Sequence, residues 1–178
     1  TDAFVRDALE RAPKNLQRNI STPRLHHYLG HLALQNAPLP QKSWVCSAAK
    51  YDVPIFTSSP GDSSIGMNVA AMKLRGGKTT IDPDLDVLES TSIVFDAKTN
   101  GVVIMGGGSP KNFYLQTQPT LWQILDLNRG GHEYVLQIST DSPQWGGLSG
   151  ATPSEAISWG KIQPGMEKNH VVVYSDTT

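Results

Sequence analysis

One lysine lies close to an acidic and an aromatic residue at a spacing that could hold an amine ligand. Glu155 and Trp159 are four residues apart, so on a helix they share one face, and Lys161 projects just beyond them. A carboxylate and an indole ring attract an ammonium ligand through charge pairing and cation–π contact. A lysine crowded by that cation and removed from water would have a lowered pKa, which an imine-forming amine requires. The same spacing also suits a helix capping residue, a core tryptophan and a solvated lysine, and it does not decide between these readings.

A second group of residues has the types that contact a nucleotide. Gly106-Gly107-Gly108 follows an apolar run, where glycine lets the backbone approach a ligand and leaves amide groups free for an anion. Asp62 and Asp176 follow apolar runs too, and carboxylates in such places accept hydrogen bonds from ribose hydroxyls. A plain turn and two helix N-caps are the alternative readings. The glycine spacing is not the G-x-G-x-x-G fingerprint.

The sequence offers no candidate residues for metal-dependent or hydrolytic catalysis. His27 and His31 have the i, i+4 spacing of a metal-binding pair, but no third ligand accompanies them, so we predict no metal site. All five histidines, His26, His27, His31, His132 and His170, are interpreted as helix-surface or packing residues. There is no serine nucleophile elbow and no Cys-His arrangement.

The elements that would position these residues alternate between strands and helices. Four short apolar runs predict strands buried on both faces of a parallel sheet: Val53–Phe56, Val102–Met105, Tyr134–Ile138 and Val171–Tyr174. Helices are predicted from the cap Ser21-Thr22-Pro23 onward, and over Asp82–Phe95, Pro110–Leu127 and Pro153–Lys161. This order predicts an α/β fold with a doubly wound, mostly parallel sheet.

Small polar, glycine or acidic residues follow each predicted strand. Because parallel strands end at the same edge of a sheet, we expect these residues to converge there, where open α/β sheets bind ligands. The residues concerned are Asp62 after the first strand, Gly106 after the second, Thr140 and Asp141 after the third, and Asp176 and Thr177 after the fourth.

Composition limits the class of protein. The 178 residues suit one domain, 1–178, and a net charge of -1 excludes the basic footprint of a nucleic-acid binder. Charged residues make up 17%, below the usual quarter or so, which predicts a surface partly covered by other protein. No apolar run has the length of a membrane span, and the N-terminus lacks the layout of a secretory signal. Together with the single Cys46, this predicts a cytoplasmic protein.

The segment Ser158-Trp159-Gly160-Lys161-Ile162 resembles the deoxyhypusine synthase family, and so does Gly147–Ile157, which leads into it. Gly106–Lys111 and Asp62–Gly66, the latter following Val53–Phe56, are similar to the same family. These segments occur in the family's order and span nearly the whole chain. The resemblance implies a Rossmann-like NAD-binding sheet with helices on both faces.

The resemblance also implies an enzyme, an NAD-dependent aminobutyltransferase. NAD would oxidise spermidine, its 4-aminobutyl group would pass to an enzyme lysine as an imine, and an acceptor amine would receive it. The acceptor is a lysine of the hypusine-containing translation factor or, in homospermidine synthase-like enzymes, a diamine. A non-catalytic NAD-binding paralogue is a further alternative.

By position in the family motifs, Lys161 would be the imine-forming lysine. The substrate-binding residues would be Glu155, Trp159, Gly107, Asn112, Gly146 and Gly147. The NAD-binding residues would be Asp62, Gly106, Thr140, Asp141, Asp176 and Thr177. The eukaryotic enzymes have an acidic residue, a histidine and an aspartate where this chain has Met67, Asn112 and Leu148. This pattern is closer to the divergent prokaryotic branch.

The family chain is about twice as long as this one. The residues seen here would be its C-terminal half, and the resemblance implies a homotetramer, or an assembly with the missing N-terminal half, whose sites lie at subunit interfaces.

Overall fold

The computed structural model describes residues 2–177. By its internal contacts the chain divides into two compact units, Thr1–Asp86 (unit 1) and Val87–Thr178 (unit 2), and each is described by itself. The expectation that residues 1–178 form a single domain stays a prediction.

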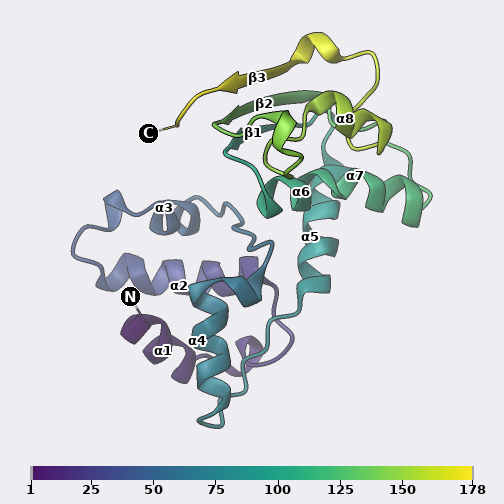
Figure 1. Cartoon of the computed structure of the whole chain (residues 1–178). Coiled ribbons are helices and arrows are strands. Elements are labelled where there is room, and N and C mark those ends of the chain that lie inside the picture. Colours follow the sequence, from purple (N-terminus) through teal and green to yellow (C-terminus); the bar gives the residue numbers. More distant parts are fainter. Residues whose placement is uncertain (1, 178) are drawn as a thin grey trace. The chain divides into compact units, whose positions relative to one another are not determined.

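Unit 1 is helical (Figure 1). Its helices are α1 (Asp2–Glu10), α2 (Thr22–Asn36), α3 (Trp44–Lys50) and α4 (Ser64–Lys73), with short 3-10 turns at Lys14–Leu16, Pro40–Lys42 and Pro60–Asp62. Apolar side chains from α1, α2 and α4, with Ile20 just before α2, form its core: Val5, Ala8, Leu9, Ile20, Leu25, Leu29, Val69 and Met72. Burial of this apolar area is the main force that holds the three helices together.

A buried carboxylate secures the start of α2. The helix begins at Thr22 after the N-cap Ser21, with Pro23 in its first turn, as the sequence predicts. The Ser21 side chain makes no capping bond. Instead, Asp86 accepts hydrogen bonds from the Thr22 backbone amide at 2.6 Å and from the Thr22 hydroxyl at 2.7 Å. A carboxylate at a helix N-terminus is stabilised by the helix dipole, so Asp86 takes over the role of the cap.

The strand predicted over Val53–Phe56 is wrong. The segment is extended but is not part of a sheet, and Val53 is 56% exposed. The Val53 amide bonds to the Ala48 carbonyl at the end of α3, and Pro54 has no amide to donate. No strand of the described residues pairs with it. An apolar run becomes a strand only when a neighbour completes the hydrogen-bond ladder.

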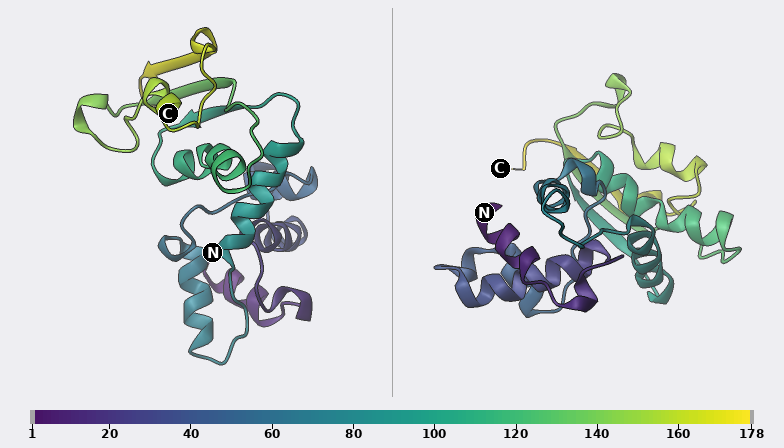
Figure 2. Two further views of the ribbon diagram at one scale, coloured as in Figure 1. Left: turned by 90° about the vertical axis from the view of Figure 1, so that its right-hand side faces the viewer. Right: turned by 90° about the horizontal axis from the view of Figure 1, so that it is seen from below.

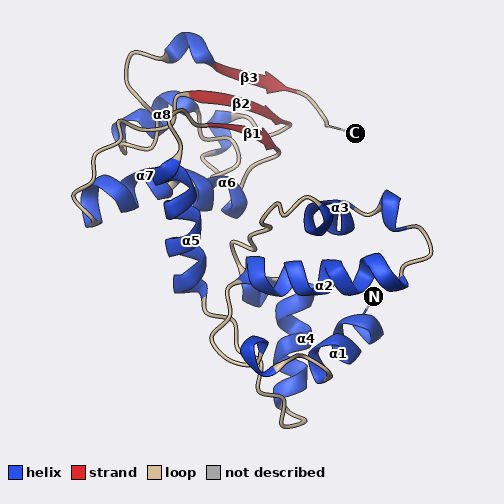
Figure 3. Ribbon diagram, turned by 180° about the vertical axis from the view of Figure 1, so that it is seen from behind, coloured by secondary structure: helices blue, strands red, loops and turns tan. Residues whose placement is uncertain are grey.

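Unit 2 contains a parallel sheet. Most of the helix α5 (Pro83–Asp96) belongs to this unit, and it is followed by β1 (Gly101–Met105), β2 (Tyr134–Ser139) and β3 (His170–Tyr174). The strands lie in the order β1-β2-β3, with Met105 opposite Ile138 and Ser139 opposite Tyr174 (Figure 3). The α/β class and the parallel Rossmann-like sheet are therefore confirmed, with three of the four predicted strands.

Two helical connections join the three strands. Between β1 and β2 lie α6 (Ser109–Leu115), α7 (Thr117–Pro119) and a π-helical turn (Thr120–Ile124). The single helix predicted over Pro110–Leu127 is therefore interrupted, because Pro119 cannot donate to the helix and the next turn widens. Between β2 and β3 lie a 3-10 turn (Pro143–Trp145), α8 (Pro153–Ser158) and a second 3-10 turn (Glu167–Asn169).

Both connections pack on the same face of the sheet. Ile104 of β1 and Val135 of β2 point to this face and pack with Leu115 of α6, Ala156 of α8 and Ile162. The two further views in Figure 2 show the three strands side by side. The core of unit 2 therefore lies between the sheet and the pair α6 and α8.

The opposite face of the sheet is apolar and accessible, and we call it the open sheet face. By the strand register and the alternation of side chains it comprises Val103, Met105, Leu136, Ile138, Val171 and Val173. Val103 is 65% exposed and Met105 is 73% exposed. Parallel sheets are ordinarily buried on both faces, so this face has the composition of a covered surface.

Candidate active site

The C-terminal end of α8 determines where Lys161 enters its pocket. The Lys161 amide donates to the Ala156 carbonyl and the Gly160 amide donates to the Ile157 carbonyl, the pair of bonds that defines a Schellman motif. Gly160 has a φ of +67°, which L side chains rarely adopt. A Cβ at Gly160 would lie 2.4–2.6 Å from atoms of the Trp122 indole. The helix predicted over Pro153–Lys161 therefore ends at Ser158, and Lys161 follows in a bend.

The N-terminal end of α8 is closed by a capping box. The Thr152 hydroxyl accepts a hydrogen bond from the Glu155 amide, and the Glu155 carboxylate accepts one from the Thr152 amide. Glu155 thus has the capping role that the sequence offers as one reading. Its side chain also lines the cavity that contains Lys161, so the two readings of Glu155 are compatible.

Lys161 projects into a cavity of about 260 Å³ between α6 and α8. Its Nζ donates a hydrogen bond of 2.7 Å to Oδ1 of Asn112, and Nζ lies 5.9 Å from the centre of the Trp159 ring. Burial lowers the pKa of Lys161 from the usual value for lysine. A lysine with a lowered pKa is more often in the neutral form that attacks carbon.

The alternative interpretations of Trp159 as a core residue and of Lys161 as a solvated lysine are wrong. Trp159 is 66% exposed, so it is not a core residue, and Lys161 is partly buried, so it is not a fully solvated helix-end lysine. The Trp159 indole is therefore open to solvent and lies beside the partly buried amine of Lys161.

Lys111 is a component of this pocket that the sequence did not single out. It is only 7% exposed, and its Nζ donates to Gln137 Oε1 at 3.1 Å and to the carbonyls of Ala151 and Leu148 at 2.5 and 3.4 Å. Burial lowers the pKa of Lys111; the Glu155 carboxylate opposes this and the Lys161 ammonium adds to it. Lys111 directly follows Gly106–Pro110, and this place in a family motif was the only signal available for it.

The predicted substrate-binding residues divide into two groups. Glu155, Trp159 and Asn112 line the cavity together with Lys161, and so does Leu148. Gly107, Gly146 and Gly147 do not line it. Gly107 instead supports one wall, because a Cβ there would lie 2.7 Å from the Ser149 Cα. The two other glycines have open space around them.

The predicted cofactor-binding residues of unit 2 follow the ends of adjacent strands. Gly106 follows β1, Thr140 and Asp141 follow β2, and Asp176 and Thr177 follow β3, so all five lie at the carboxyl edge of the sheet. A backbone bond from Ser175 to Ser139 joins the ends of β2 and β3. Asp62 belongs to unit 1, where it is exposed at the end of a 3-10 turn that precedes α4.

The backbone of Lys161 does not lie at this carboxyl edge. The Lys161 carbonyl accepts a bond from the His132 amide, and Ile162 forms a parallel bridge with His132, which precedes β2. The backbone of Lys161 therefore lies at the amino end of β2, and its side chain reaches back under the sheet toward α6. None of the predicted cofactor-binding residues lines the lysine cavity.

Residues 2–177 contain no group of three or more His, Cys, Asp or Glu residues that could hold a metal ion. Among the described helices, none combines the length and apolarity needed to cross a membrane.

Comparison with known proteins shows the family to which this sequence belongs. The deoxyhypusine synthase family model matches residues 1–178. A deoxyhypusine synthase-like protein of Nostoc punctiforme is 47% identical over 190 residues, which cover 100% of this chain and 47% of the relative. A deoxyhypusine synthase-like protein of Thermosynechococcus vestitus is also 47% identical, over 100% of this chain and 46% of the relative. A probable deoxyhypusine synthase 2 of Methanosarcina acetivorans is 48% identical over 78% of this chain and 39% of its own length.

These matches extend over the lysine pocket as well as the sheet that supports it. The chain spans about half the length of the curated relatives it matches. With a family model that covers every residue and relatives that share almost half of the sequence, the chain belongs to the deoxyhypusine synthase family.

Proposed function

We propose that this protein takes part in NAD-dependent transfer of the 4-aminobutyl group of spermidine, with Lys161 as the amine that carries the group. The observation that supports this most directly is the position of Lys161. Its amine is partly buried with a lowered pKa, faces the Trp159 ring and is held by a neutral acceptor, Asn112. A carboxylate in place of Asn112 would favour the ammonium form, whereas an amide does not.

The residues of the pocket would each have a role in the proposed transfer. The exposed Trp159 ring and the Glu155 carboxylate provide a surface for the cationic polyamine. Neutral Lys161 attacks the carbon of the oxidised polyamine, the three-carbon diamine leaves, and a lysine imine carrying the butylamine remains. An acceptor amine then attacks the same carbon and releases Lys161. Asn112 orients the lysine amine through its hydrogen bond.

The residues at the carboxyl edge of the sheet fit a dinucleotide. Asp141 and Asp176 provide carboxylates of the kind that bind ribose hydroxyls. Gly106 has a φ of +86° and open space where a Cβ would stand, so the backbone there is accessible to a ligand. Thr140 and Thr177 add hydroxyl groups at the same edge. The chemistry that bound NAD supplies is removal of a hydride from the polyamine and its later return.

Borohydride trapping tests the role of Lys161. The chain is incubated with NAD and with spermidine labelled in its aminobutyl portion, reduced with borohydride and analysed by peptide mass spectrometry. We expect the label on Lys161, its loss in Lys161→Arg, and full labelling of the control Lys168→Arg, which changes an exposed lysine of the same unit. Equal labelling of Lys161→Arg and wild type contradicts the proposal. Uptake of NAD without any adduct would identify a binding-only member of the family.

The acceptor is tested in the same assay. Putrescine and the hypusine-containing translation factor are offered separately, and label that moves to the diamine indicates homospermidine formation. Label that moves to a protein lysine indicates deoxyhypusine formation. Leu148 and Asn112 line the pocket in which the acceptor amine would react. The eukaryotic enzymes have charged or titratable residues at these two positions.

We also propose that the part of the family chain absent here covers the open sheet face. Two observations support this: the face consists of six apolar residues of a parallel sheet, of which Val103, Met105, Val171 and Val173 are exposed, and the chain spans about half of its relatives. The remaining half of the Nostoc punctiforme relative should bind this chain when the two are produced together. The variant Val103→Asp should abolish binding, and Lys168→Asp should not. The family resemblance implies a homotetramer, which would contain four copies of this complex of the two halves. Sedimentation of the complex measures the size of the assembly.

A further inference from the structure

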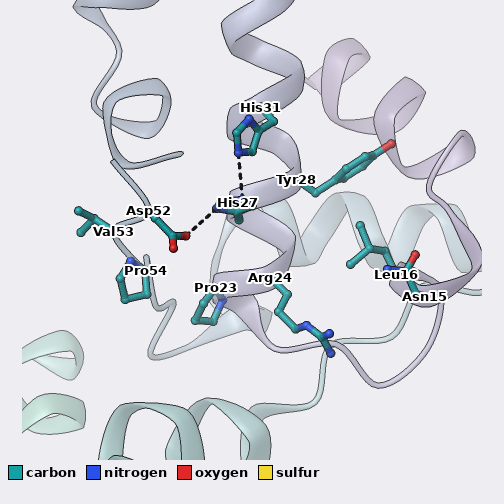
Figure 4. A pocket seen from close by; sticks show the side chains of 10 residues that line it. All are labelled: Asn15, Leu16, Pro23, Arg24, His27, Tyr28, His31, Asp52, Val53 and Pro54. Carbon is teal, nitrogen blue, oxygen red and sulfur yellow. Dashed lines mark hydrogen bonds and ion pairs between the residues drawn. The ribbon is translucent and has the colours of Figure 1, made fainter. Parts of the chain in front are cut away.

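Two histidines in unit 1 form a hydrogen bond with each other through the same ring nitrogen. His27 and His31 lie one turn apart on α2, and their Nε2 atoms are 2.9 Å apart (Figure 4). Their ring centres are 4.4 Å apart with the planes at 66°. Both side chains are exposed, so a small ion in solution can reach both nitrogens.

An aspartate from another segment stands behind one of these rings. The Asp52 carboxylate is 3.6 Å from Nδ1 of His27, and it comes from the turn that follows α3. Histidines that bind metals usually donate their second ring N–H to a carboxylate, which orients the ring and leaves the other nitrogen free to bind. Asp52 has a φ of +54°, a backbone conformation that few residues other than glycine adopt. The sequence showed the histidine spacing, but not this carboxylate.

The two nitrogens form a hydrogen bond of 2.9 Å, which an ion bound to both of them would replace. Two bonds of about 2.0–2.1 Å that meet at a right angle place their nitrogens about 2.9 Å apart, so a right-angled ion needs little movement of the rings, and a tetrahedral angle would need about 3.4 Å. Sites with right angles and nitrogen and oxygen ligands are typical of Cu²⁺ and Ni²⁺.

We propose that His27 and His31 bind one Ni²⁺ or Cu²⁺ ion through their Nε2 atoms, with Asp52 as the residue that positions His27. Water fills the other coordination positions, because no described residue offers a third ligand. A cavity of about 450 Å³ adjoins the pair, and Asp52, Val53 and Pro54 form one of its walls. In Figure 4, Arg24 and Tyr28 point away from the two imidazoles.

Calorimetric titration of the untagged full chain with Ni²⁺ tests the site. Wild type should bind one ion per chain, and His27→Gln and His31→Gln should each lose at least tenfold in affinity. Asp52→Asn should lose about tenfold, since residues behind a ligand contribute on this scale. Gln35→Ala, one turn beyond His31 on the exposed side of α2, is the matched control and should bind as wild type does.

A second measurement does not depend on the variants. Cu²⁺ added to the wild-type chain should give an electron paramagnetic resonance spectrum with two imidazole nitrogens. Saturable Ni²⁺ binding together with this spectrum supports the proposal. Unchanged affinity in both glutamine variants overturns it, and so does a wild-type chain that shows no saturable binding.

Discussion

Lys161 Nζ and Asn112 Oδ1 lie 2.7 Å apart, although 49 positions separate the two residues in the chain. Asn112 is in the first turns of α6, and Lys161 follows the Schellman end of α8. The two helices pack on the same face of the sheet, which brings the amide and the amine together. The hydrogen bond orients the amine without adding a negative charge beside it.

Asn112→Asp should suppress formation of the lysine adduct. A carboxylate at this distance favours the ammonium form, so the pKa of Lys161 rises. At a fixed pH below that pKa, the neutral fraction then falls about tenfold per unit. The rate of borohydride-trapped labelling, measured against pH, should shift to higher pH. Asn112→Ser, which is neutral, is the control, and coincident profiles of Asn112→Asp and wild type would contradict the assignment.

Gly160→Ala should destabilise unit 2 more than Gly165→Ala. Both glycines have positive φ, of 67° and 80°, so alanine at either position costs about 1–2 kcal/mol. Only the Gly160 substitution also drives a Cβ into the Trp122 indole, which adds about 1–3 kcal/mol for overpacking. Urea denaturation measures the difference. Equal losses for the two variants would show that the indole moves aside freely.

Lys111→Met should loosen the wall of the lysine pocket. The carbonyls of Ala151 and Leu148 would lose their donor, at a cost of about 1–3 kcal/mol for buried acceptors left unpaired. Amide hydrogen exchange over residues 147–151 should become faster. Lys168→Met, at an exposed position, should change stability by less than about 0.5 kcal/mol. Unchanged exchange in Lys111→Met would mean that Lys111 does not hold this segment.

Unit 2 should lose stability in mild acid because of His132. Burial lowers the pKa of His132 from 6.5 to about 4, although hydrogen bonding to the Tyr114 and Leu115 backbone opposes this. Between these two values the unfolded chain binds a proton that the folded chain does not, so stability falls as the pH drops from 6.5 to 4. The loss is on the order of 3 kcal/mol. Denaturation followed by tryptophan fluorescence at pH 7 and pH 4 measures it, and His132→Asn should flatten the dependence. An equally steep dependence in that variant would assign the loss to other groups.

The signals that predicted the elements correctly are local ones. The β1, β2 and β3 runs and the starts of α2, α5 and α8 were visible because apolar spacing and proline positions act within a few residues. The Val53–Phe56 run has the same local signal and no partner strand, so it forms none. A strand depends on a second segment, which a local pattern does not include.

The candidate site likewise has residues that local patterns predicted and residues that they did not. The residue types around Lys161, with Glu155 and Trp159 on one face, were readable from spacing, and the family motif supplied their chemistry. The buried Lys111 was not readable, because an isolated lysine is ordinarily exposed. Its burial results from the packing of α6 against the segment that holds Leu148 and Ala151.

By itself, the sequence determined the α/β class, and it singled out Lys161 and the acidic and glycine residues that follow the strands as candidates. Only the tertiary structure decided that Asn112 holds the lysine amine, that Lys161 enters from the amino end of β2, and that Asp52 stands behind His27. Each of these relationships joins residues at least 25 positions apart. Such contacts are decided by packing and chain topology, and not by local spacing.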